Sequence, residues 1–270
     1  MLLAIDVGNS DTKLGYFAPS ASGALELAMN WRVTTARRRS ADEAGVLFTA
    51  LFRRASVPLD AVSAVVVSSV VPQNDRALRE ACIRYFGCEP DFFTAAEQDL
   101  IAIRTDRPKE LGADLAAAAL GARERFGAPL VVVGFGTATT FGAVGRDGSF
   151  LGAAIAPGIQ TSIDALVAGT AKLPQVALDA PPAAIGRDTV TALQSGIVFG
   201  FVGQTEAIVA RMKAELGAGT TVVATGGLAE IVARQTRAVD AVEPHLVLEG
   251  LRLYYERRTL RERAPGAAVV

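Results

Sequence analysis

The sequence predicts an α/β fold made of two related halves with a cleft between them. Residues 3–10 and residues 131–138 each combine an apolar strand, a turn of small residues that includes glycine, and the start of a second extended segment. Strands and helices alternate over the rest of the chain, a pattern typical of α/β domains. The repeated motif therefore predicts two similar halves, and ligands commonly bind between such halves.

The boundary between the halves has no linker-like composition to mark it. We expect it near residues 108–111, which gives an N-terminal half over residues 1–109 and a C-terminal half over residues 110–270. The chain has 270 residues, of which 50% are hydrophobic and 20% are charged. This composition is sufficient for a sizeable core in each half.

The elements of the N-terminal half follow from turn and capping signals. Ser40 and Glu43 have the S-x-x-E spacing of a capping box and predict the start of a helix. Gly87 is placed to end the helix that precedes it. The expected elements are a hairpin over residues 2–5 and 13–17, strands over residues 25–33 and 61–71, and helices after residue 40 and over residues 77–86.

The C-terminal half continues the alternation of strands and helices. An alanine-rich helix is expected before Gly127, and Asp147 with Gly148 forms a strong hairpin turn. Pro157 and Gly158 end the strand that follows this turn. The expected elements are helices over residues 111–126, 189–216, 229–235 and 249–258, and strands over residues 130–133, 138–144, 150–156 and 221–224.

The overall composition argues against a nucleic-acid or membrane partner. The formal net charge is -1 and no strong basic patch occurs. No apolar run approaches the roughly 20 residues of a membrane span, and the N-terminus lacks the features of a signal peptide. The two cysteines, Cys82 and Cys88, have no metal-binding spacing and are expected to be ordinary thiols. We therefore expect a cytoplasmic protein.

The first chemical motif lies at the end of the first strand. Asp6 is followed by a turn of small residues in which Gly8 allows close approach of the backbone. The N–H groups of such a turn can face a phosphate, and Lys13 can add a positive charge. Asp6 can hold Mg²⁺, usually through water. The alternative is a plain hairpin in which the Asp and Asn residues only form the turn.

Two further glycine turns follow other strands. Gly136 and Thr137 supply a turn with a hydroxyl, and Gly226 with Gly227 connects a strand to a helix. The second turn would let an adenosine lie against the backbone, although it could also be an ordinary connection. The sequence contains neither the phosphate-binding G-x-x-x-x-G-K-[ST] motif nor the dinucleotide-binding G-x-G-x-x-G motif. The three turns in this order are more specific than any one of them.

These motifs resemble the phosphate-1, phosphate-2 and adenosine motifs of the superfamily of actin, sugar kinases and heat-shock chaperones. Within it, the chain is similar to type III pantothenate kinases along nearly its whole length. The resemblance implies an actin-like (ribonuclease H-like) fold in each half. The stretches that carry it include Trp31-Arg32-Val33, Ser68-Ser69-Val70-Val71-Pro72, Gly112-Ala113-Asp114, Gly136-Thr137-Ala138-Thr139-Thr140, Ala156-Pro157-Gly158, Ala171-Lys172-Leu173-Pro174, Ile185-Gly186, Ser195-Gly196 and Leu248-Glu249-Gly250-Leu251.

The resemblance implies ATP-dependent phosphorylation of pantothenate to 4'-phosphopantothenate, the first step of coenzyme A biosynthesis, by a homodimer. It makes Asp114 the proton acceptor, although an Asp near the start of a helix could also act only as a cap. Mg²⁺ is expected at Asp6. The residues implied in ATP binding are Asp6, Val7, Gly8, Asn9, Ser10, Asp11, Thr12, Lys13, Gly136, Thr137, Gly226 and Gly227, and those implied in pantothenate binding are Thr105, Gly112, Ala113, Asp114, Leu115 and Thr189.

Some positions depart from the family pattern. Leu115 stands where an Arg usually helps to bind pantothenate, and Thr105 stands where a Tyr is usual. Gly134 stands where an Asp usually coordinates a monovalent cation, potassium or ammonium, and an Asp is also common at Gly142. Three hypotheses remain open at this point: an active pantothenate kinase, a kinase for another small hydroxyl compound, and a degenerate member that binds nucleotide in a regulatory or interaction role.

Overall fold

The computed structural model describes residues 1–170 and 173–263, so Ala171 and Lys172 of one stretch quoted above lie outside the described residues. The chain forms two compact units, each made of segments that are not consecutive in the sequence. Among the described residues, unit 1 consists of residues 1–101, 107–121 and 247–263, and unit 2 consists of residues 102–106, 122–170 and 173–246. The division of the related halves at residues 109/110 stays a prediction.

The sheet of unit 1 has five strands in the order β3-β2-β1-β4-β5. The strands β1 (Leu2–Val7), β2 (Asp11–Pro19) and β3 (Leu25–Thr34) form an antiparallel meander, whereas β4 (Ala64–Ser69) and β5 (Asp91–Phe92) run parallel to β1. Every residue of β1 is buried. A strand in the middle of a sheet that is covered on both faces reads as a continuous apolar run, which explains the composition of β1.

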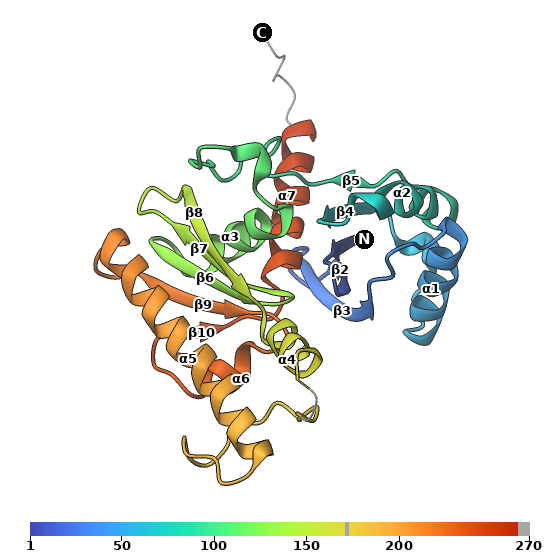
Figure 1. The fold of residues 1–270 in the computed structure, drawn as a ribbon. Helices are drawn as coiled ribbons and strands as arrows, with labels where there is room; N and C mark the ends of the chain where they lie inside the picture. Colours follow the sequence, from blue (N-terminus) through green and yellow to red (C-terminus); the bar gives the residue numbers. More distant parts are fainter. Residues whose placement is uncertain (171–172, 264–270) are drawn as a thin grey trace. The chain divides into compact units, whose positions relative to one another are not determined.

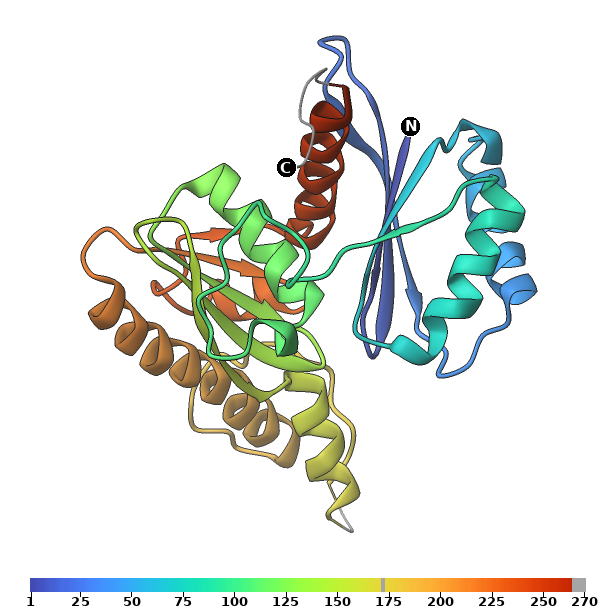
Figure 2. The same cartoon turned by 90° about the horizontal axis from the view of Figure 1, so that it is seen from above.

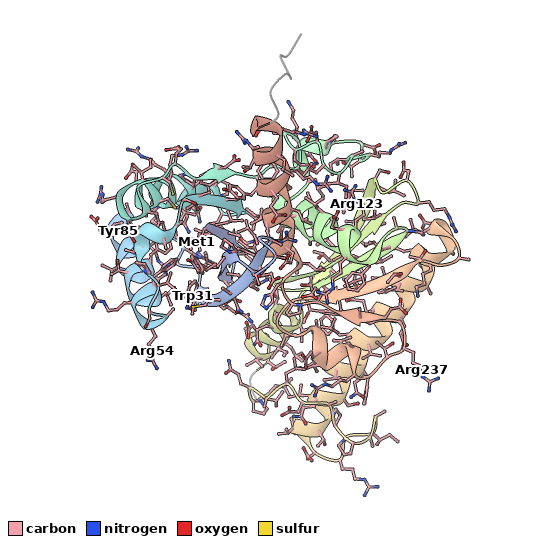
Figure 3. The ribbon with its side chains drawn as sticks, turned by 180° about the vertical axis from the view of Figure 1, so that it is seen from behind. Met1, Trp31, Arg54, Tyr85, Arg123 and Arg237 are labelled. Carbon is pink, nitrogen blue, oxygen red and sulfur yellow. The ribbon has the colours of Figure 1, made fainter. Side chains whose placement is uncertain are left out.

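Two helices, α1 (Ala41–Arg54) and α2 (Pro72–Phe86), cover one face of this sheet, and α7 (Leu246–Arg263) lies on the other face (Figure 2). The predicted capping box is present, because Glu43 N–H donates to Ser40 Oγ and Ser40 N–H donates to the Glu43 carboxylate. Trp31 is partly buried and packs against the core of the unit, with its ring stacked on Phe52 at a centroid distance of 5.2 Å (Figure 3).

Unit 2 repeats this arrangement (Figure 1). Its sheet has the order β10-β9-β6-β7-β8, in which β6 (Leu130–Phe135), β7 (Ala138–Val144) and β8 (Phe150–Pro157) form the meander. The strands β9 (Thr221–Thr225) and β10 (Ala241–Val242) run parallel to β6. Both units therefore have a central strand with a hairpin on one side and a parallel strand on the other, which confirms the predicted fold class.

The helices α4 (Ile159–Ala168), α5 (Thr189–Leu216) and α6 (Ala229–Ala233) pack their apolar side chains against one face of this second sheet. The helix α3 (Ala113–Phe126) and two short 3₁₀ turns, η1 (Leu59–Ala61) and η2 (Pro108–Glu110), complete the fold. No helix among the described residues has both the length and the apolar character needed to cross a membrane. Cys82 and Cys88 are free thiols.

Several element boundaries differ from those expected. The helix α2 starts at Pro72 instead of residue 77, because proline is well suited to the first position of a helix. The helix α4 was not predicted, because its N-cap residue is Gly158, which has no side chain to form a capping hydrogen bond and so gives no signal for a helix start. The helix α7 begins at Leu246 and not at residue 249. The two-residue strands β5 and β10 are too short to give a pattern.

Candidate active site

The hairpin of β1 and β2 places an acid and a base opposite each other at the end of a buried strand. Asp6 and Lys13 are directly paired across the two strands. Because paired residues on neighbouring strands share one face of the sheet, their side chains meet. Lys13 Nζ lies 3.7 Å from Asp6 Oδ2, and the Asp6 side chain is only 7% exposed. The phosphate-1 motif thus has a buried carboxylate with one positive charge beside it.

Ser68 is a third polar group at this point, and sequence reasoning assigned no role to it. The strand β4 runs parallel to β1 and pairs Ser68 with Asp6. Ser68 is fully buried, and its hydroxyl is near enough to favour the charged form of Asp6. It completes no hydrogen bond of normal geometry with any described residue. The sequence signal for Ser68 is a polar residue at the carboxyl end of the apolar run Val65-Val66-Val67.

Asp114 lies in the first turn of α3, within the same unit. Its Oδ1 accepts a hydrogen bond from the Leu115 N–H at 2.9 Å. A Cβ atom at Gly112 would lie 2.5 Å from that oxygen, which is closer than real Cβ atoms approach. Residue 112 must therefore be glycine for the carboxylate to occupy this position. Ala113 is the first residue of the helix.

Burial raises the pKa of both carboxylates. Burial raises the pKa of Asp6 from 3.8 to about 6, and the negative charge of Asp114 adds to the rise, while Lys13 and Ser68 oppose it. Burial also raises the pKa of Asp114, against the opposing effects of the Leu115 N–H and of Lys13. One lysine beside a buried and a partly buried carboxylate leaves the site short of positive charge, so the residues present fit a bound cation.

The helix α7 packs against both elements that carry the two carboxylates, the β1–β2 hairpin with Asp6 and the helix α3 with Asp114. A Cβ atom at Gly250 would lie 1.9 Å from the backbone oxygen of Ala117, one turn after Asp114 in α3. Two residues earlier, Leu248 packs against Gly15 of β2, 3.0 Å from where a Cβ would be. Gly15 lies on the same face of β2 as Lys13. The spacing between the hairpin and α3 therefore depends on backbone contact at Gly250.

A second group of predicted residues comes together in unit 2, at the turn between β6 and β7. The backbone oxygen of Thr137 accepts hydrogen bonds from Gly158 N–H at 3.1 Å and from Thr161 Oγ1 at 2.7 Å. Gly226 has φ +102°, and a Cβ atom there would lie 2.4 Å from the Phe135 backbone oxygen. The phosphate-2 turn and the adenosine turn are thus in direct backbone contact.

Gly134 lies in β6, opposite Thr140 of β7. A Cβ atom at Gly134 would lie 2.6 Å from Thr140 Oγ1, so the threonine hydroxyl occupies the space next to the missing side chain. No carboxylate is available from residue 134 itself. The residues at this position do not fit a charged ligand set for a monovalent cation.

The remaining predicted residues are distributed over both units. Leu115 follows Asp114 in α3 of unit 1, whereas Thr105 and Thr189 belong to unit 2. The Thr105 hydroxyl is buried and has no hydrogen-bond partner among the described residues. Thr189 is the first residue of α5, after the capping residue Asp188. The turn and strand residues Val7, Gly8, Asn9, Ser10, Asp11 and Thr12 accompany Asp6 and Lys13 in unit 1, and Gly227 follows Gly226 in unit 2.

The raised pKa of Asp6 predicts a pH-dependent cost in stability. The folded pKa is about 6 and the ordinary value is 3.8, so charging Asp6 destabilises the fold progressively between about pH 4 and pH 6. Asp6→Asn should therefore raise the free energy of unfolding at pH 7.5, by on the order of 1–3 kcal/mol. The gain should disappear near pH 4. Urea unfolding without divalent cations measures it, with the exposed Asp60→Asn as control. Equal gains at both pH values would contradict the assignment.

Comparison with known proteins shows relatives that match nearly the whole chain. Residues 2–211 match the family model of type III pantothenate kinase. The chain is 44% identical over 259 residues to a type III pantothenate kinase of Moorella thermoacetica, covering 96% of this chain and 100% of that protein. It is 47% identical over 257 residues to that of Myxococcus xanthus, covering 95% and 98%.

Solved structures are similar at the level of the fold. The activator of 2-hydroxyisocaproyl-CoA dehydratase from Clostridium difficile, solved with bound ADPNP, has a TM-score of 0.52 at 11% identity over 99% of both chains. The ethanolamine utilization protein EutJ from Carboxydothermus hydrogenoformans has a TM-score of 0.51 at 16% identity, covering 93% of this chain and 89% of that one. With a family model that matches most of its length and full-length relatives above 40% identity, the chain belongs to the type III pantothenate kinase family.

Proposed function

We propose that this protein transfers the γ-phosphoryl group of ATP to the primary hydroxyl of pantothenate, the first step of coenzyme A biosynthesis, in the cytoplasm. Its membership of the kinase family supports the reaction class. The observation that carries the mechanism is the pair of carboxylates, the buried Asp6 and the partly buried Asp114, beside the positive charge of Lys13. Nothing in the comparisons favours the alternative of a degenerate, regulatory family member.

Asp114 is proposed as the general base. The hydroxyl oxygen of pantothenate forms a bond to the γ-phosphorus, the bond from that phosphorus to the bridging oxygen breaks, and ADP leaves with that oxygen. The hydroxyl proton passes to the Asp114 carboxylate. A pKa raised by burial makes Asp114 a better proton acceptor than an exposed aspartate. The Leu115 N–H fixes the orientation of its Oδ1.

The phosphates of ATP are proposed to bind the segment from Asp6 to Lys13, with Lys13 as a point charge. In unit 2, the turn of Gly136 and Thr137 is proposed for phosphate, and Gly226 with Gly227 for adenosine. Mg²⁺ would be held at Asp6 and would neutralise phosphate charge. No group of three or more His, Cys, Asp or Glu side chains among the described residues could hold a metal. An ion at Asp6 would therefore keep water and phosphate oxygens as its other ligands.

Pantothenate is proposed to bind along Gly112, Ala113, Asp114 and Leu115, with Thr105 and Thr189 as further contacts. The buried Thr105 hydroxyl has no partner within the described residues and can serve a polar group of the substrate. Leu115 offers no donors in place of the fork of an arginine. Selectivity for pantothenate over another small hydroxyl compound would therefore rest on the remaining polar contacts.

A coupled assay of ADP release with pantothenate, with mass spectrometry of the product, tests the function and its cation dependence together. We expect 4'-phosphopantothenate, and turnover that changes less than about twofold between sodium-only and potassium buffers of equal ionic strength, because Gly134 supplies no charged ligand. Gly134→Asp with Thr140→Ala, which clears the space beside residue 134, should increase the potassium response. Thr140→Ala alone is the control. Absence of phosphorylated product overturns the proposed function. Strong potassium activation of the wild type overturns the inference that Gly134 leaves the protein without a site for a monovalent cation.

Asp114→Asn should lower the rate of phosphoryl transfer at least a hundredfold, because the proton acceptor is lost. The affinity for ATP should change less than about threefold, since the phosphate-binding turns are untouched. Turnover and equilibrium binding of a fluorescent ATP analogue measure the two quantities. Wild-type turnover in the variant would show that Asp114 only caps α3.

Gly250→Ala should lower kcat at least tenfold with a smaller effect on ATP affinity, because the added methyl group pushes α7 away from Ala117 and displaces the first turn of α3. The pH profile of kcat should also shift, since the two carboxylates move relative to each other. Leu260→Ala, at an exposed position of the same helix, is the matched control. A folded Gly250→Ala protein with an unchanged pH profile and kcat would contradict the positioning role.

We also propose a homodimer. The helix α5 presents apolar residues on more than the face that packs in its own unit, with Val190 44% exposed. Multi-angle light scattering at micromolar concentration should give twice the monomer mass of 28.1 kDa. A monomer over the whole concentration range would contradict the proposal.

A further inference from the structure

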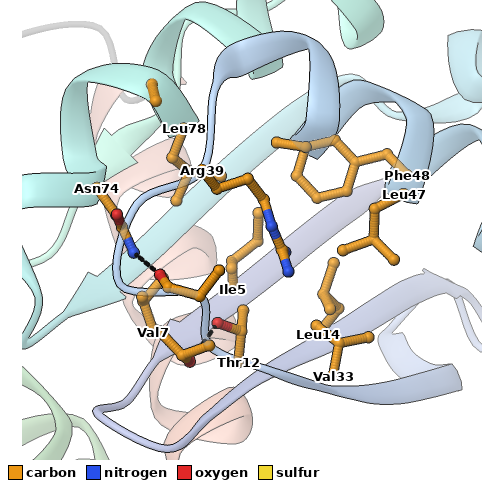
Figure 4. A pocket seen from close by; sticks show the side chains of 14 residues that line it. Ile5, Val7, Thr12, Leu14, Val33, Arg39, Leu47, Phe48, Asn74 and Leu78 are labelled. Atoms are coloured by element: carbon orange, nitrogen blue, oxygen red, sulfur yellow. Dashed lines mark hydrogen bonds between the residues drawn. The ribbon is translucent and has the colours of Figure 1, made fainter.

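Figure 4 shows a cavity in unit 1 whose lining includes Ile5 and Val7 of β1. Side chains alternate along a strand, so Ile5 and Val7 point towards α1 and α2 whereas Asp6 points to the other face. The cavity has a volume of about 40 Å³, which is room for roughly three water molecules or a short carbon chain. Its apolar wall includes Ile5, Val7, Leu14, Val33, Phe48 and Leu78.

A positive charge that forms no ion pair with any described residue borders this apolar wall. Arg39, in the loop between β3 and α1, lies over the cavity (Figure 4). Its guanidinium donates one hydrogen bond, to the Thr34 backbone oxygen at 3.3 Å, and forms no ion pair with a described residue. The hydrogen bonds from Ser40 lower the pKa of the Glu43 carboxylate, and the charge of Arg39 adds a smaller effect in the same direction. A forked guanidinium in this state is suited to a carboxylate.

An unsatisfied acceptor also lines the cavity. Asn74 Nδ2 donates to the Ala36 backbone oxygen at 2.8 Å, which fixes the loop that carries Arg39. The other polar atom of this amide, Asn74 Oδ1, is buried and accepts no hydrogen bond from any described residue. A buried acceptor without a partner costs free energy, and a ligand that donates a hydrogen bond there would recover it. The cavity thus offers an apolar body, a cation and an acceptor.

The cavity is also joined to the phosphate-1 hairpin. Val7 and Thr12, which line it, lie on either side of the turn over residues 8–11. The hydroxyls of Thr12 and Thr35 are 2.8 Å apart, which links the hairpin to the loop of Arg39. A ligand that orders this loop would therefore also act on the turn.

We propose that this cavity is a regulatory site for a small aliphatic carboxylate that carries a hydroxyl or amide N–H. The carboxylate pairs with Arg39, the aliphatic body fills the space under α1 and α2, and the donor serves Asn74. Occupation changes the affinity of the β1–β2 hairpin for nucleotide, a consequence that rests on the function proposed above. The binding itself is independent of that function.

Calorimetric titration of the full chain with 2-hydroxybutanoate, whose ethyl group and hydroxyl match the size of the cavity, tests the site, with 2-hydroxybutanamide as its uncharged analogue. For a ligand of this size we expect a Kd on the order of 1 mM for the carboxylate. The amide should bind at least tenfold more weakly, because it lacks the charge that pairs with Arg39.

Three variants distinguish this site from adventitious binding. Arg39→Met should weaken the carboxylate at least tenfold and leave the amide unchanged, whereas Arg38→Met, at the neighbouring exposed position, should have no effect. Ala77→Leu, which fills the cavity, should abolish binding while thermal unfolding shows that the protein is folded. Equal affinity of the two probes, or retention of the carboxylate by Arg39→Met, overturns the site.

The regulatory part of the proposal is tested by titrating the protein with Mg-ATP in the presence and in the absence of saturating 2-hydroxybutanoate. We expect the Kd of the nucleotide to change at least threefold in the wild type, because a ligand coupled to the nucleotide site must alter nucleotide affinity. No change is expected in Arg39→Met, which binds the carboxylate weakly. An unchanged nucleotide Kd in a protein that binds the carboxylate overturns the regulation. A wild type that binds no nucleotide without the probe instead contradicts the proposed function.

Discussion

The burial of the Asp6 carboxylate at the carboxyl end of β1 is the constraint on which the candidate site depends. A carboxylate that is 7% exposed needs partners, because burial without them disfavours the charged form. The fold supplies Lys13 from one neighbouring strand and the Ser68 hydroxyl from the other, and it then places a second carboxylate, Asp114, within electrostatic reach. The arrangement is costly for stability and suited to a site that receives a cation and a phosphate.

Close contacts at glycines hold the groups of the site in place. In unit 1, Gly112 leaves room for the Asp114 carboxylate, and Gly250 lets α7 touch the backbone of α3. In unit 2, Gly226 rests against the backbone of Phe135, beside the turn of Thr137. Contacts between backbones do not relax by side-chain rotation, so they define distances more firmly than contacts between flexible side chains. The glycines of this chain thus serve the geometry of the site as well as its turns.

The sheet of unit 1 gives its two faces different chemistry. Side chains of β1 alternate, so the face of Asp6 carries charge while the face of Ile5 and Val7 packs under α1 and α2. The hairpin turn joins the faces, since residues on either side of it contribute to both. The Arg39 loop is tied to this hairpin through Thr35, which gives the apolar face a physical connection to the phosphate-binding turn.

The sequence by itself determined the fold class, most strands and helices, and the three glycine turns, because these follow from local periodicity, capping and turn chemistry. The capping box of Ser40 and the end of α2 at Gly87 needed no tertiary information. Strand pairing decided the rest. Ser68 gained a role only because β4 lies parallel to β1, and Gly250 only because α7 packs on α3. The compact units also combine segments distant in the sequence, which no local pattern encodes. Local chemistry is readable along the chain, whereas contacts between distant segments exist only once the chain has folded.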